Sequence, residues 1–471
     1  MKILQRKKAA AKKFGKTERW TFESFVFDHS KKQVGDLSAE KRFVGNYVKN
    51  CRLKQGALCR GVGLAPLTVG ETEVPSIVGV TAAKFFSLPV LQDDGTYVEK
   101  LGIVDTNGIL YYYEDGATSF VADRLFGAGV QPIVAMDKTG KTYPLFAGSG
   151  GLWYATDENV SAVIDGGVAP IACVFKDRVL CVIEPFTVAY SAALAPTNFA
   201  DSIDDSGKIS FPSEKGKIVG LLPFQECVYV FYEYGVSKWT LAGRAREFTM
   251  EKVEYNGGRI VQGSMGVCAL KGEKAFFLAE DGLYSFDGKT AKRICESLCV
   301  KPKKGIQVCN HAASLGYFFL GFETETGAKT GFVVDVEREE GYYTFPLEGL
   351  STCRGKAVCL SEKKVRSIEN DGDYPSGFIA RFDTIGARFG TGVKTLKTLV
   401  FTGEGAVSVT VLCGYKTVRK RIEFQNGRAS MRVWLRGETF DFVIALEKGS
   451  VVRRLDVELG VCEYAEKDNK E

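Results

Sequence analysis

Histidine is almost absent from this chain. His29 and His311 are the two histidines among 471 residues, and they stand far apart in unlike contexts. The sequence therefore offers almost no histidine from which a Ser/His/Asp or Cys/His catalytic arrangement could be built. A zinc site would need nearby histidines or tight cysteine pairs, and the closest cysteines, Cys295 and Cys299, have three residues between them. We expect no metal, no cofactor and no enzymatic activity.

Long hydrophobic runs are missing as well. No apolar stretch approaches the roughly 18 residues that a membrane span requires, and the basic N-terminus lacks the apolar centre of a secretory signal. We therefore expect no membrane span and no export. The 13 cysteines are an odd number spread along the chain, which in that setting favours reduced thiols, buried as small hydrophobic residues.

Phosphate-binding and acid/base motifs are incomplete. The segment AMDKTGKT (Ala135–Thr142) nearly matches a phosphate-binding loop, but Ala135 stands where the first glycine should be. Tyr143 and Pro144 follow where a helix would have to begin, so we predict a turn between strands. The carboxylate pairs Asp93-Asp94 and Asp204-Asp205 lie in loop-like sequence, which is typical of solvated turns.

Glycine and aromatic residues are plentiful, and they form a repeated unit. Two apolar hairpins between Ile171 and Gly243 flank an irregular polar excursion, Leu194–Lys217. Similar units, each a strand, a turn and a strand with an aromatic residue, recur at a spacing of about 40–50 residues, the period of a β-propeller. They begin at Leu101, Leu145, Leu180, Tyr229, Phe276, Phe318 and Ala357.

The pattern predicts an all-β chain with a β-propeller of about six or seven blades over residues 46–375. A pair of β-sandwiches is the alternative. To close the propeller, we expect a strand near Cys51–Leu58 to pair with a strand from Ser351–Ser367, because closure removes the open sheet edges.

The last part of the chain alternates more strictly. Apolar residues alternate with charged ones that we place on a solvent-facing side, namely Arg419, Lys420, Arg421, Arg432 and Arg436. We predict a small β-sandwich or jelly roll with a short charged tail over residues 376–471.

Residues 1–45 are expected to form a basic N-terminal arm and lead-in. The cations of this arm are candidates for contact with nucleic acid or an acidic partner, although a solvated terminus is the plainer alternative. The candidate residues are Arg6, Lys7, Lys8, Lys12, Lys13, Lys16 and Arg19.

Three segments resemble bacteriophage tail proteins built on a β-propeller. NYVKNCRLKQGALCRGVG (Asn46–Gly63) is similar to their opening strand. The segment Phe175–Asp201 contains a Ser-Ala-x-x-x-Pro-Thr-Asn-aromatic loop like theirs, and Ser376–Leu399 resembles their exit from the propeller. In size and order the chain looks most like the packaged-DNA stabilisation, or tail-hub, proteins of short-tailed phages.

This resemblance implies a structural virion protein of the phage tail, assembled in the host cytoplasm. Such a protein forms a homo-oligomeric ring below the portal, contacts portal and tail-adaptor proteins, and helps to retain packaged DNA. Two other functions stay open. One is a carbohydrate- or receptor-binding propeller, in which Trp153, Trp239 and Trp434 would provide stacking surfaces, although packing in the core or between blades is the plainer role for them. The other is a propeller hydrolase.

Overall fold

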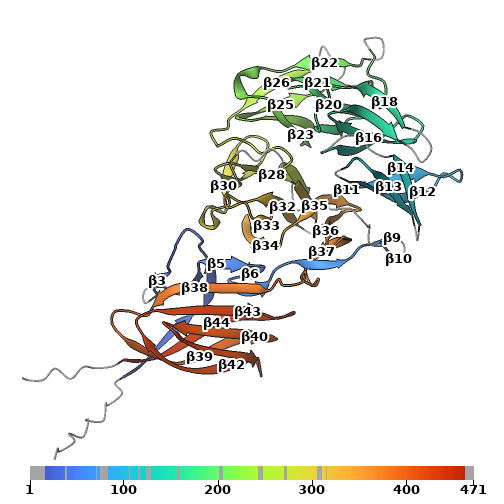
Figure 1. Ribbon diagram of the computed structural model, residues 1–471. Coiled ribbons are helices and arrows are strands. Elements are labelled where there is room, and N and C mark those ends of the chain that lie inside the picture. The colour runs from blue at the N-terminus through green and yellow to red at the C-terminus, as the bar shows by residue number, and fades with distance from the viewer. Residues whose placement is uncertain are drawn as a thin grey trace, which may run out of the picture. The chain divides into compact units, whose positions relative to one another are not determined.

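The computed structural model is all-β, as the composition predicted (Figure 1). Its only helical turns among the described residues are η1 (Ser213–Lys215) and η3 (Glu296–Leu298). The chain divides into unit 1, Met1–Gly61 with Ile379–Glu471, and unit 2, Val62–Phe378. The structure describes residues 16–37, 40–69, 72–74, 83–105, 107–114, 117–122, 129–155, 160–200, 205–241, 248–269, 273–304, 310–314 and 316–461.

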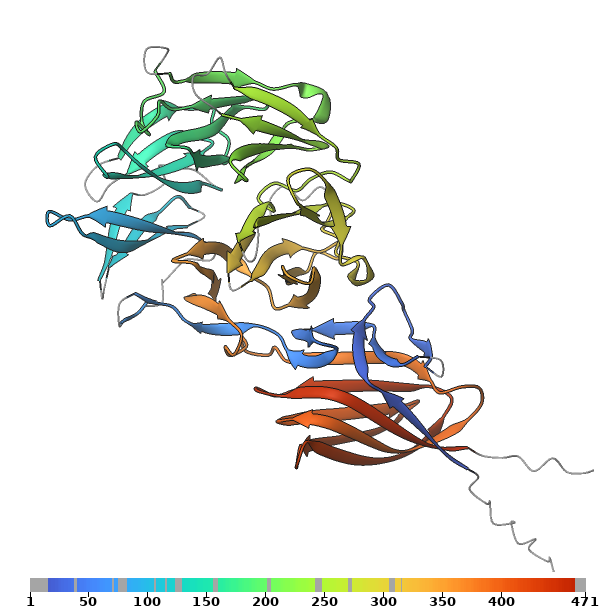
Figure 2. The same cartoon turned by 180° about the vertical axis from the view of Figure 1, so that it is seen from behind.

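Unit 2 contains seven four-stranded antiparallel sheets within its described residues (Figure 2). In chain order, the first three are β11 (Ala83–Leu91), β12 (Tyr97–Asp105), β13 (Leu110–Glu114), β14 (Ala117–Ala122); β15 (Gln131–Met136), β16 (Thr142–Gly148), β17 (Gly151–Ala155), β18 (Val160–Asp165); and β19 (Ala172–Phe175), β20 (Arg178–Glu184), β21 (Thr187–Tyr190), β22 (Gly207–Ser210).

The next three sheets are β23 (Ile218–Phe224), β24 (Cys227–Tyr232), β25 (Gly235–Thr240), β26 (Thr249–Val253); β27 (Gly266–Ala269), β28 (Glu273–Ala279), β29 (Gly282–Phe286), β30 (Ala291–Ile294); and β31 (Asn310–Ser314), β32 (Tyr317–Glu323), β33 (Lys329–Asp335), β34 (Glu340–Thr344). The seventh is β35 (Glu348–Cys353), β36 (Lys356–Ser361), β37 (Lys364–Glu369) and β8 (Gly63–Pro66). A short hairpin, β9 (Thr68–Val69) and β10 (Thr72–Glu73), follows β8.

Each of the seven predicted hairpins is the central pair of strands of one sheet. The hairpin that begins at Leu101 is β12–β13, and the one that begins at Ala357 is β36–β37. The five between them are β16–β17, β20–β21, β24–β25, β28–β29 and β32–β33. The periodicity in the sequence therefore identified these strand pairs correctly.

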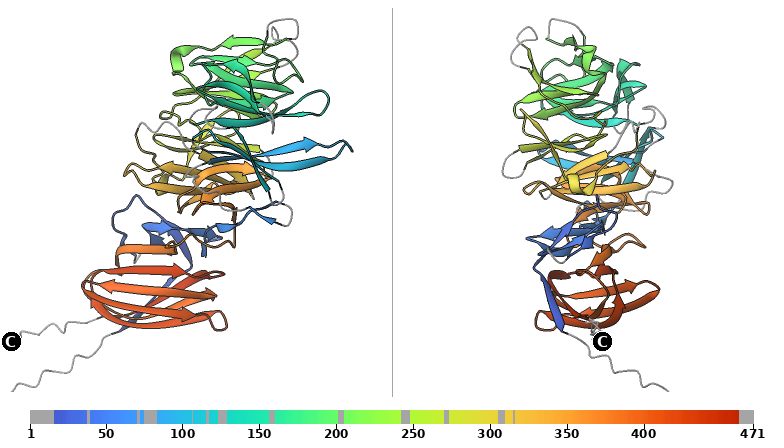
Figure 3. Two further views of the ribbon diagram at one scale, coloured as in Figure 1. Left: turned by 45° about the vertical axis from the view of Figure 1, so that its right-hand side comes forward. Right: turned by 90° about the vertical axis from the view of Figure 1, so that its left-hand side faces the viewer.

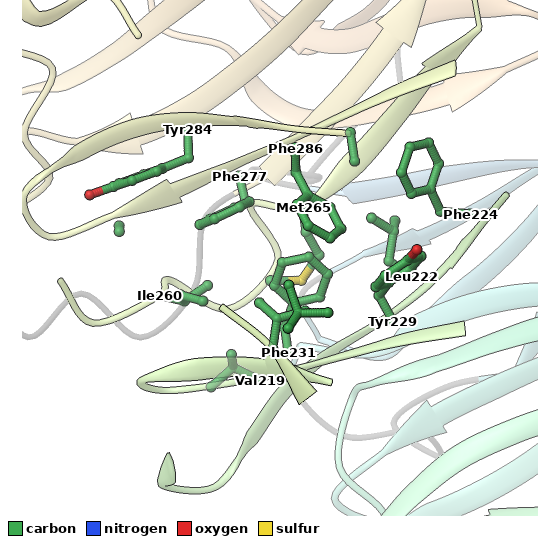
Figure 4. Close-up of a cluster of buried hydrophobic side chains, with 14 of the residues drawn as sticks. Val219, Leu222, Phe224, Tyr229, Phe231, Ile260, Met265, Phe277, Tyr284 and Phe286 are labelled. Atoms are coloured by element: carbon green, nitrogen blue, oxygen red, sulfur yellow. The ribbon is translucent and has the colours of Figure 1, made fainter. Parts of the chain in front are cut away.

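The sheets of unit 2 pack face to face, which explains their apolar central strands. Every residue of β24 is buried, because both faces of such a sheet are covered by neighbours. Figure 4 shows one of these cores, in which Phe231 of β24 lies with its ring centroid 5.3 Å from that of Phe277 in the next sheet. The edge-on ring geometry adds to the stabilisation from buried area.

The first strands of the seven sheets lie side by side in a closed series. β11 contacts β15, each later first strand contacts the next, and β35 contacts both β31 and β11. The last sheet takes its fourth strand from the start of unit 2, because β37 pairs with β8, Glu369 opposite Gly63. This is the strand arrangement of a β-propeller.

The predicted closing strand near Cys51–Leu58 is wrong. Those residues belong to β6 (Cys51–Lys54) and β7 (Ala57–Arg60), which form a local hairpin in unit 1. The strand that does pair with β37 is β8, Gly-Leu-Ala-Pro, which is too short for an alternating pattern. At Gly63 a Cβ would lie 2.1 Å from the carbonyl oxygen of Gly372, so the backbones approach too closely for a larger residue.

Unit 1 is built from both ends of the chain, in two six-stranded sheets. One has the order β42-β39-β44-β7-β6, with β1 also paired to β44; the other has the order β3-β38-β43-β40-β41, with β5 also paired to β38. β2 pairs with β4 in parallel. The bounds not yet given are β1 (Thr17–Phe22), β2 (Ser24–Phe27), β3 (Gly35–Asp36), β4 (Arg42–Gly45), β5 (Tyr47–Lys49), β38 (Ala380–Arg388), β39 (Lys394–Glu404), β40 (Ala406–Cys413), β41 (Lys416–Glu423), β42 (Arg428–Gly437), β43 (Phe440–Leu446) and β44 (Val451–Val461).

The expected division into an arm over 1–45, a propeller from 46 and a C-terminal domain over 376–471 therefore needs correction. Figure 3 shows the N-terminal strands running among the C-terminal ones. Phe43 packs its ring 5.4 Å from that of Phe442, and both are buried. β1 also covers one edge of β44, which would otherwise stay open. Pairing between residues more than 400 positions apart leaves no local signal in the sequence.

Candidate nucleic-acid interface

One face of β42 carries an arginine at every fourth residue. Ala429, Met431, Val433 and Leu435 of this strand are buried, and the even-numbered residues between them are exposed, because side chains alternate across a strand. The exposed set includes Arg428, Arg432 and Arg436, whose backbones are spaced by about 13 Å. Among the described residues, none of these three guanidinium groups forms an ion pair.

Trp434 stands exposed in the same row, between Arg432 and Arg436. Its side chain lies at a bulge, where Val433 and Trp434 oppose the single residue Lys397 of β39. The residue is 58% exposed and has a φ of 55°, a left-handed conformation that bulky residues rarely adopt. Bulges of this kind redirect a side chain, and here the result is an indole presented to solvent among cations.

The cationic row extends across the sheet onto β44 and β1. Arg432 of β42 lies opposite Thr398 of β39. On the other side of β39, Thr398 lies opposite Glu458 of β44, and Glu458 lies opposite Arg19 of β1. Residues directly opposite one another share a face. The face therefore brings six cations together with two carboxylates, Asp456 and Glu458; the cations are Arg19, Lys397, Arg428, Arg432, Arg436 and Arg454. We call these residues and Trp434 the arginine face.

Asp456 anchors the β1 side of the arginine face. Its buried carboxylate accepts hydrogen bonds from Thr21 Oγ1 at 2.6 Å, from Arg454 at 3.0 Å and from Arg19 at 3.2 Å. Burial by itself would raise the pKa of Asp456, but these hydrogen bonds and the two guanidinium charges hold the pKa below its usual value. The single negative charge of Asp456 thus positions both Arg19 and Arg454 but balances only one of their two positive charges.

The sequence identified part of this face. Arg19, one of the predicted contact residues, lies on it, and Lys16 is exposed next to β1 with its carbonyl bonded to the Val461 amide at 3.2 Å. The other predicted contact residues, Arg6, Lys7, Lys8, Lys12 and Lys13, lie outside the described residues. Arg428 was missed, although the arginine spacing on an alternating strand was visible in the sequence, and Trp434 was proposed as a stacking surface for carbohydrate and not as part of a cationic face.

The remaining predicted outward cations lie on β41, in the other sheet of unit 1. Arg419, Lys420 and Arg421 are exposed there. Arg421 is neutralised, because its guanidinium donates to both oxygens of Glu447, at 2.6 and 2.8 Å, and to Glu423. Lys416, Arg419 and Lys420 of this strand form no ion pair among the described residues, so β41 carries as many unpaired cations as β42 but no aromatic residue among them.

Two of the three tryptophans proposed for carbohydrate stacking are not available. Trp239 is 1% exposed and packs edge-on against Phe211 at 5.3 Å, so it is a core residue and cannot provide a stacking surface. Trp153 is half-buried and donates its indole N–H to the Gly150 carbonyl at 3.1 Å. Trp434 is the exposed one of the three.

The other chemical candidates are structural. Residues 137–141 of the Ala135–Thr142 segment form the turn between β15 and β16, as predicted, and Asp137 Oδ1 accepts from the amides of Thr139 and Lys141. Asp94 closes a similar turn through Thr96. Asp204 lies outside the described residues. The prediction of a solvated turn is wrong for Asp205, which forms an ion pair with the buried Arg178.

The two histidines belong to different units. His29, in unit 1, accepts a hydrogen bond from the Val48 amide at 3.2 Å, and His311 lies in unit 2. No group of three or more potential metal ligands occurs in the part of the chain that the structure describes. In those same residues, no helix has the length and apolar character needed to cross a bilayer.

No protein-family model matches the chain, and no curated protein matches it. Among solved structures, it is similar to the extracellular domain of the one-component system BT4673 from B. thetaiotaomicron, with 8% identity, a TM-score of 0.44 and coverage of 87% of this chain and 62% of that one. It is similar to PorZ of Porphyromonas gingivalis, a surface component of the type-IX secretion system, with 11% identity, a TM-score of 0.37 and coverage of 74% and 46%. It is also similar to the Neurospora crassa Pan2 WD40 domain, with 9% identity, a TM-score of 0.38 and coverage of 62% and 91%. The chain thus spans less than two thirds of the first two proteins, and likeness at this level says nothing of function.

Proposed function

We propose that this chain is a structural component of a bacteriophage tail that contacts packaged DNA through the arginine face. In this proposal it is not an enzyme; it assembles as a homo-oligomeric ring near the portal and binds portal and tail-adaptor proteins. The tail assignment is supported by the resemblance of Asn46–Gly63, Phe175–Asp201 and Ser376–Leu399 to propeller-based tail proteins. Its location would be the virion tail.

The observation that carries the DNA contact is the row of arginines on β42. Arg428, Arg432 and Arg436 have no opposite charge bound to them among the described residues. Nucleic acid is a dense polyanion, and cations that meet its phosphates release condensed counterions, which supplies most of the non-specific affinity. An exposed aromatic residue within such a row adds a surface on which bases stack.

The finer architecture is part of the same proposal. We take the seven sheets of unit 2 as seven propeller blades, the last closed by β8, and the two sheets of unit 1 as a sandwich. The closed series of first strands supports the blade count. The alternation of buried and exposed residues in β42 and β43 supports the sandwich, because only one side of each strand is buried.

Salt-dependent DNA binding tests the proposal. We expect the full chain to bind fluorescently labelled DNA with an affinity that falls linearly with salt on logarithmic axes. Changing Arg428→Ala, Arg432→Ala and Arg436→Ala together should weaken binding and reduce the slope by about 0.9 per lost phosphate contact on duplex DNA.

Arg421→Ala is the matched control, because that guanidinium is already neutralised by Glu447. It should leave the slope within error of the parent. If the control and the triple variant lose the same DNA affinity, the arginine face is not the DNA-binding surface. Absence of the chain from purified phage particles would end the tail assignment.

A pocket in unit 2 supports a second candidate function, carbohydrate binding. It has a volume of about 560 Å³ and is lined by the predicted Pro-Thr-Asn-aromatic loop, including Asn198 and Phe199. Asp165, Glu184 and Lys208 also line it, so an apolar wall meets several hydrogen-bonding groups, as in many small-molecule sites. Saturation-transfer NMR with neutral monosaccharides tests this function, and Phe199→Ala should abolish any signal.

A further inference from the structure

Three polar side chains, those of Lys84, Gln131 and His311, lie near the starts of three first strands in unit 2. Lys84 of β11 donates from its Nζ to Gln131 Oε1 of β15 at 2.8 Å. On the other side, the Phe85 amide bonds to Ser351 Oγ of β35 at 3.1 Å, and β35 is linked in turn to β31, the strand of His311. Lys84, Gln131 and His311 are all half-buried.

Among the residues that the structure describes, Lys84 forms no ion pair. By sequence, the seven first strands contain two charged residues, Lys84 and Glu348. Glu348 is paired with Lys329 at 2.7 Å. Lys84 has its hydrogen bond to the neutral amide of Gln131 and, among the described residues, no carboxylate partner.

His311 does not supply the missing negative charge. Its Nδ1 lies 2.8 Å from the Gly263 carbonyl oxygen, which can only accept, so that nitrogen carries a proton. Burial lowers the pKa of His311 despite this hydrogen bond, and the positive charge of Lys84 lowers it further. The imidazole is therefore neutral, stacked on Phe318 with ring centroids 5.9 Å apart.

A half-buried ammonium group without a counter-charge is unfavourable. Desolvation penalises the charged form, and burial lowers the pKa of Lys84 to about 8. The ammonium group can donate three hydrogen bonds, and Gln131 Oε1 accepts one of them. An anion of small size would accept the others and restore the charge balance.

We propose that the Lys84 site binds a small oxyanion such as inorganic phosphate. Lys84 provides the charge, and its hydrogen bond to Gln131 holds the ammonium group in place. This site is in unit 2 and is independent of the arginine face in unit 1.

Titration calorimetry of the full chain with inorganic phosphate at pH 7 and constant ionic strength tests the proposal. At this pH Lys84 is mostly protonated. We expect saturable binding of one phosphate per chain, and loss of that binding in Lys84→Met, which keeps the length of the side chain. Lys138→Met, on an exposed turn, is the matched control and should bind as the parent does.

A second variant distinguishes phosphate bound at the Lys84 site from phosphate bound at the arginine face. The variant with Arg428→Ala, Arg432→Ala and Arg436→Ala retains Lys84, so it should keep the saturable phosphate site even where it loses DNA. If Lys84→Met does not fold, phosphate protection of Lys84 in the parent against reductive methylation, read by mass spectrometry, replaces that comparison. Absence of saturable phosphate binding in the parent, unchanged binding in folded Lys84→Met, or no protection of Lys84 overturns the proposal.

Discussion

The guanidinium of Arg178 and the carboxylate of Asp205 form an ion pair at 2.6 Å that anchors the irregular excursion between β21 and β23. Arg178 also donates to the carbonyl oxygens of Ser191, at 2.8 Å, and Asp205, at 2.6 Å, and its side chain is 9% exposed. One buried arginine thus binds both ends of the loop that contains the Pro-Thr-Asn-aromatic segment. Ser191 and Asp205 are thereby both fixed to Arg178 of β20.

Replacing this arginine should release the loop. We expect Arg178→Met to lower the free energy of unfolding by about 3 kcal/mol, because it leaves a carboxylate and two carbonyl oxygens without their donor. Proteolytic cleavage within 194–217 should become faster. Urea denaturation and limited proteolysis measure the two effects, and Lys176→Met, an exposed neighbour whose ion pair with Glu226 spans 3.9 Å, should change neither.

The sequence predicted those parts of the fold that depend on local signals. Alternation and turn residues within about 15 positions define a hairpin, so each central strand pair of unit 2 was found. The pairing of Trp20 with Val457 was not, because nothing near Trp20 indicates a partner at the other end of the chain. The closing strand β8 was missed for a related reason: four residues, one of them Pro66, are too few to show a period.

The buried carboxylate of Asp456 should make unit 1 sensitive to acid. Its folded-state pKa is below the usual value, so its ionised form stabilises the fold above about pH 4 and this contribution is lost as the pH falls through the folded-state pKa. Asp456→Asn should therefore cost about 1–3 kcal/mol at pH 7 and less at pH 3. Urea denaturation at the two pH values measures this, and a pH-independent difference would contradict it.

Native thiol reactivity should separate Cys299 from the buried cysteines. Cys299 is exposed, whereas Cys173 and Cys181 are buried, and burial raises the pKa of Cys181 to about 12. Because the thiolate is the reactive form, Cys299→Ser should remove one rapidly labelled thiol from the folded chain. Cys181→Ser should leave the rapid phase unchanged, and both variants should lose one thiol in denaturant. An unchanged rapid phase in Cys299→Ser would refute this assignment.

The candidate site was predictable only to the extent that it follows strand alternation. Arg432 and Arg436 were correctly expected on an exposed face, because residues two apart share a side of a strand. Arg19 was expected to bind a partner, but its place beside Glu458 depends on the long-range pairing of β1 with β44. The conformation of Trp434 depends on a bulge opposite Lys397, and a bulge leaves no mark in the pattern of a single strand.

Trp434 allows stability and binding to be separated. Because its φ of 55° is unfavourable for a bulky residue and is allowed for glycine, Trp434→Gly should not lower the urea midpoint of the chain. The same change removes an exposed stacking surface, so affinity for single-stranded DNA should fall by about fivefold or more. Duplex binding, which depends on phosphate contacts, should change less. Tyr234→Gly, at an exposed turn in unit 2, is the control and should leave both affinities unchanged. An indole that served the fold alone would give the reverse pattern, with a lower midpoint and unaltered DNA binding, as measured by denaturation and fluorescence anisotropy on the same preparations.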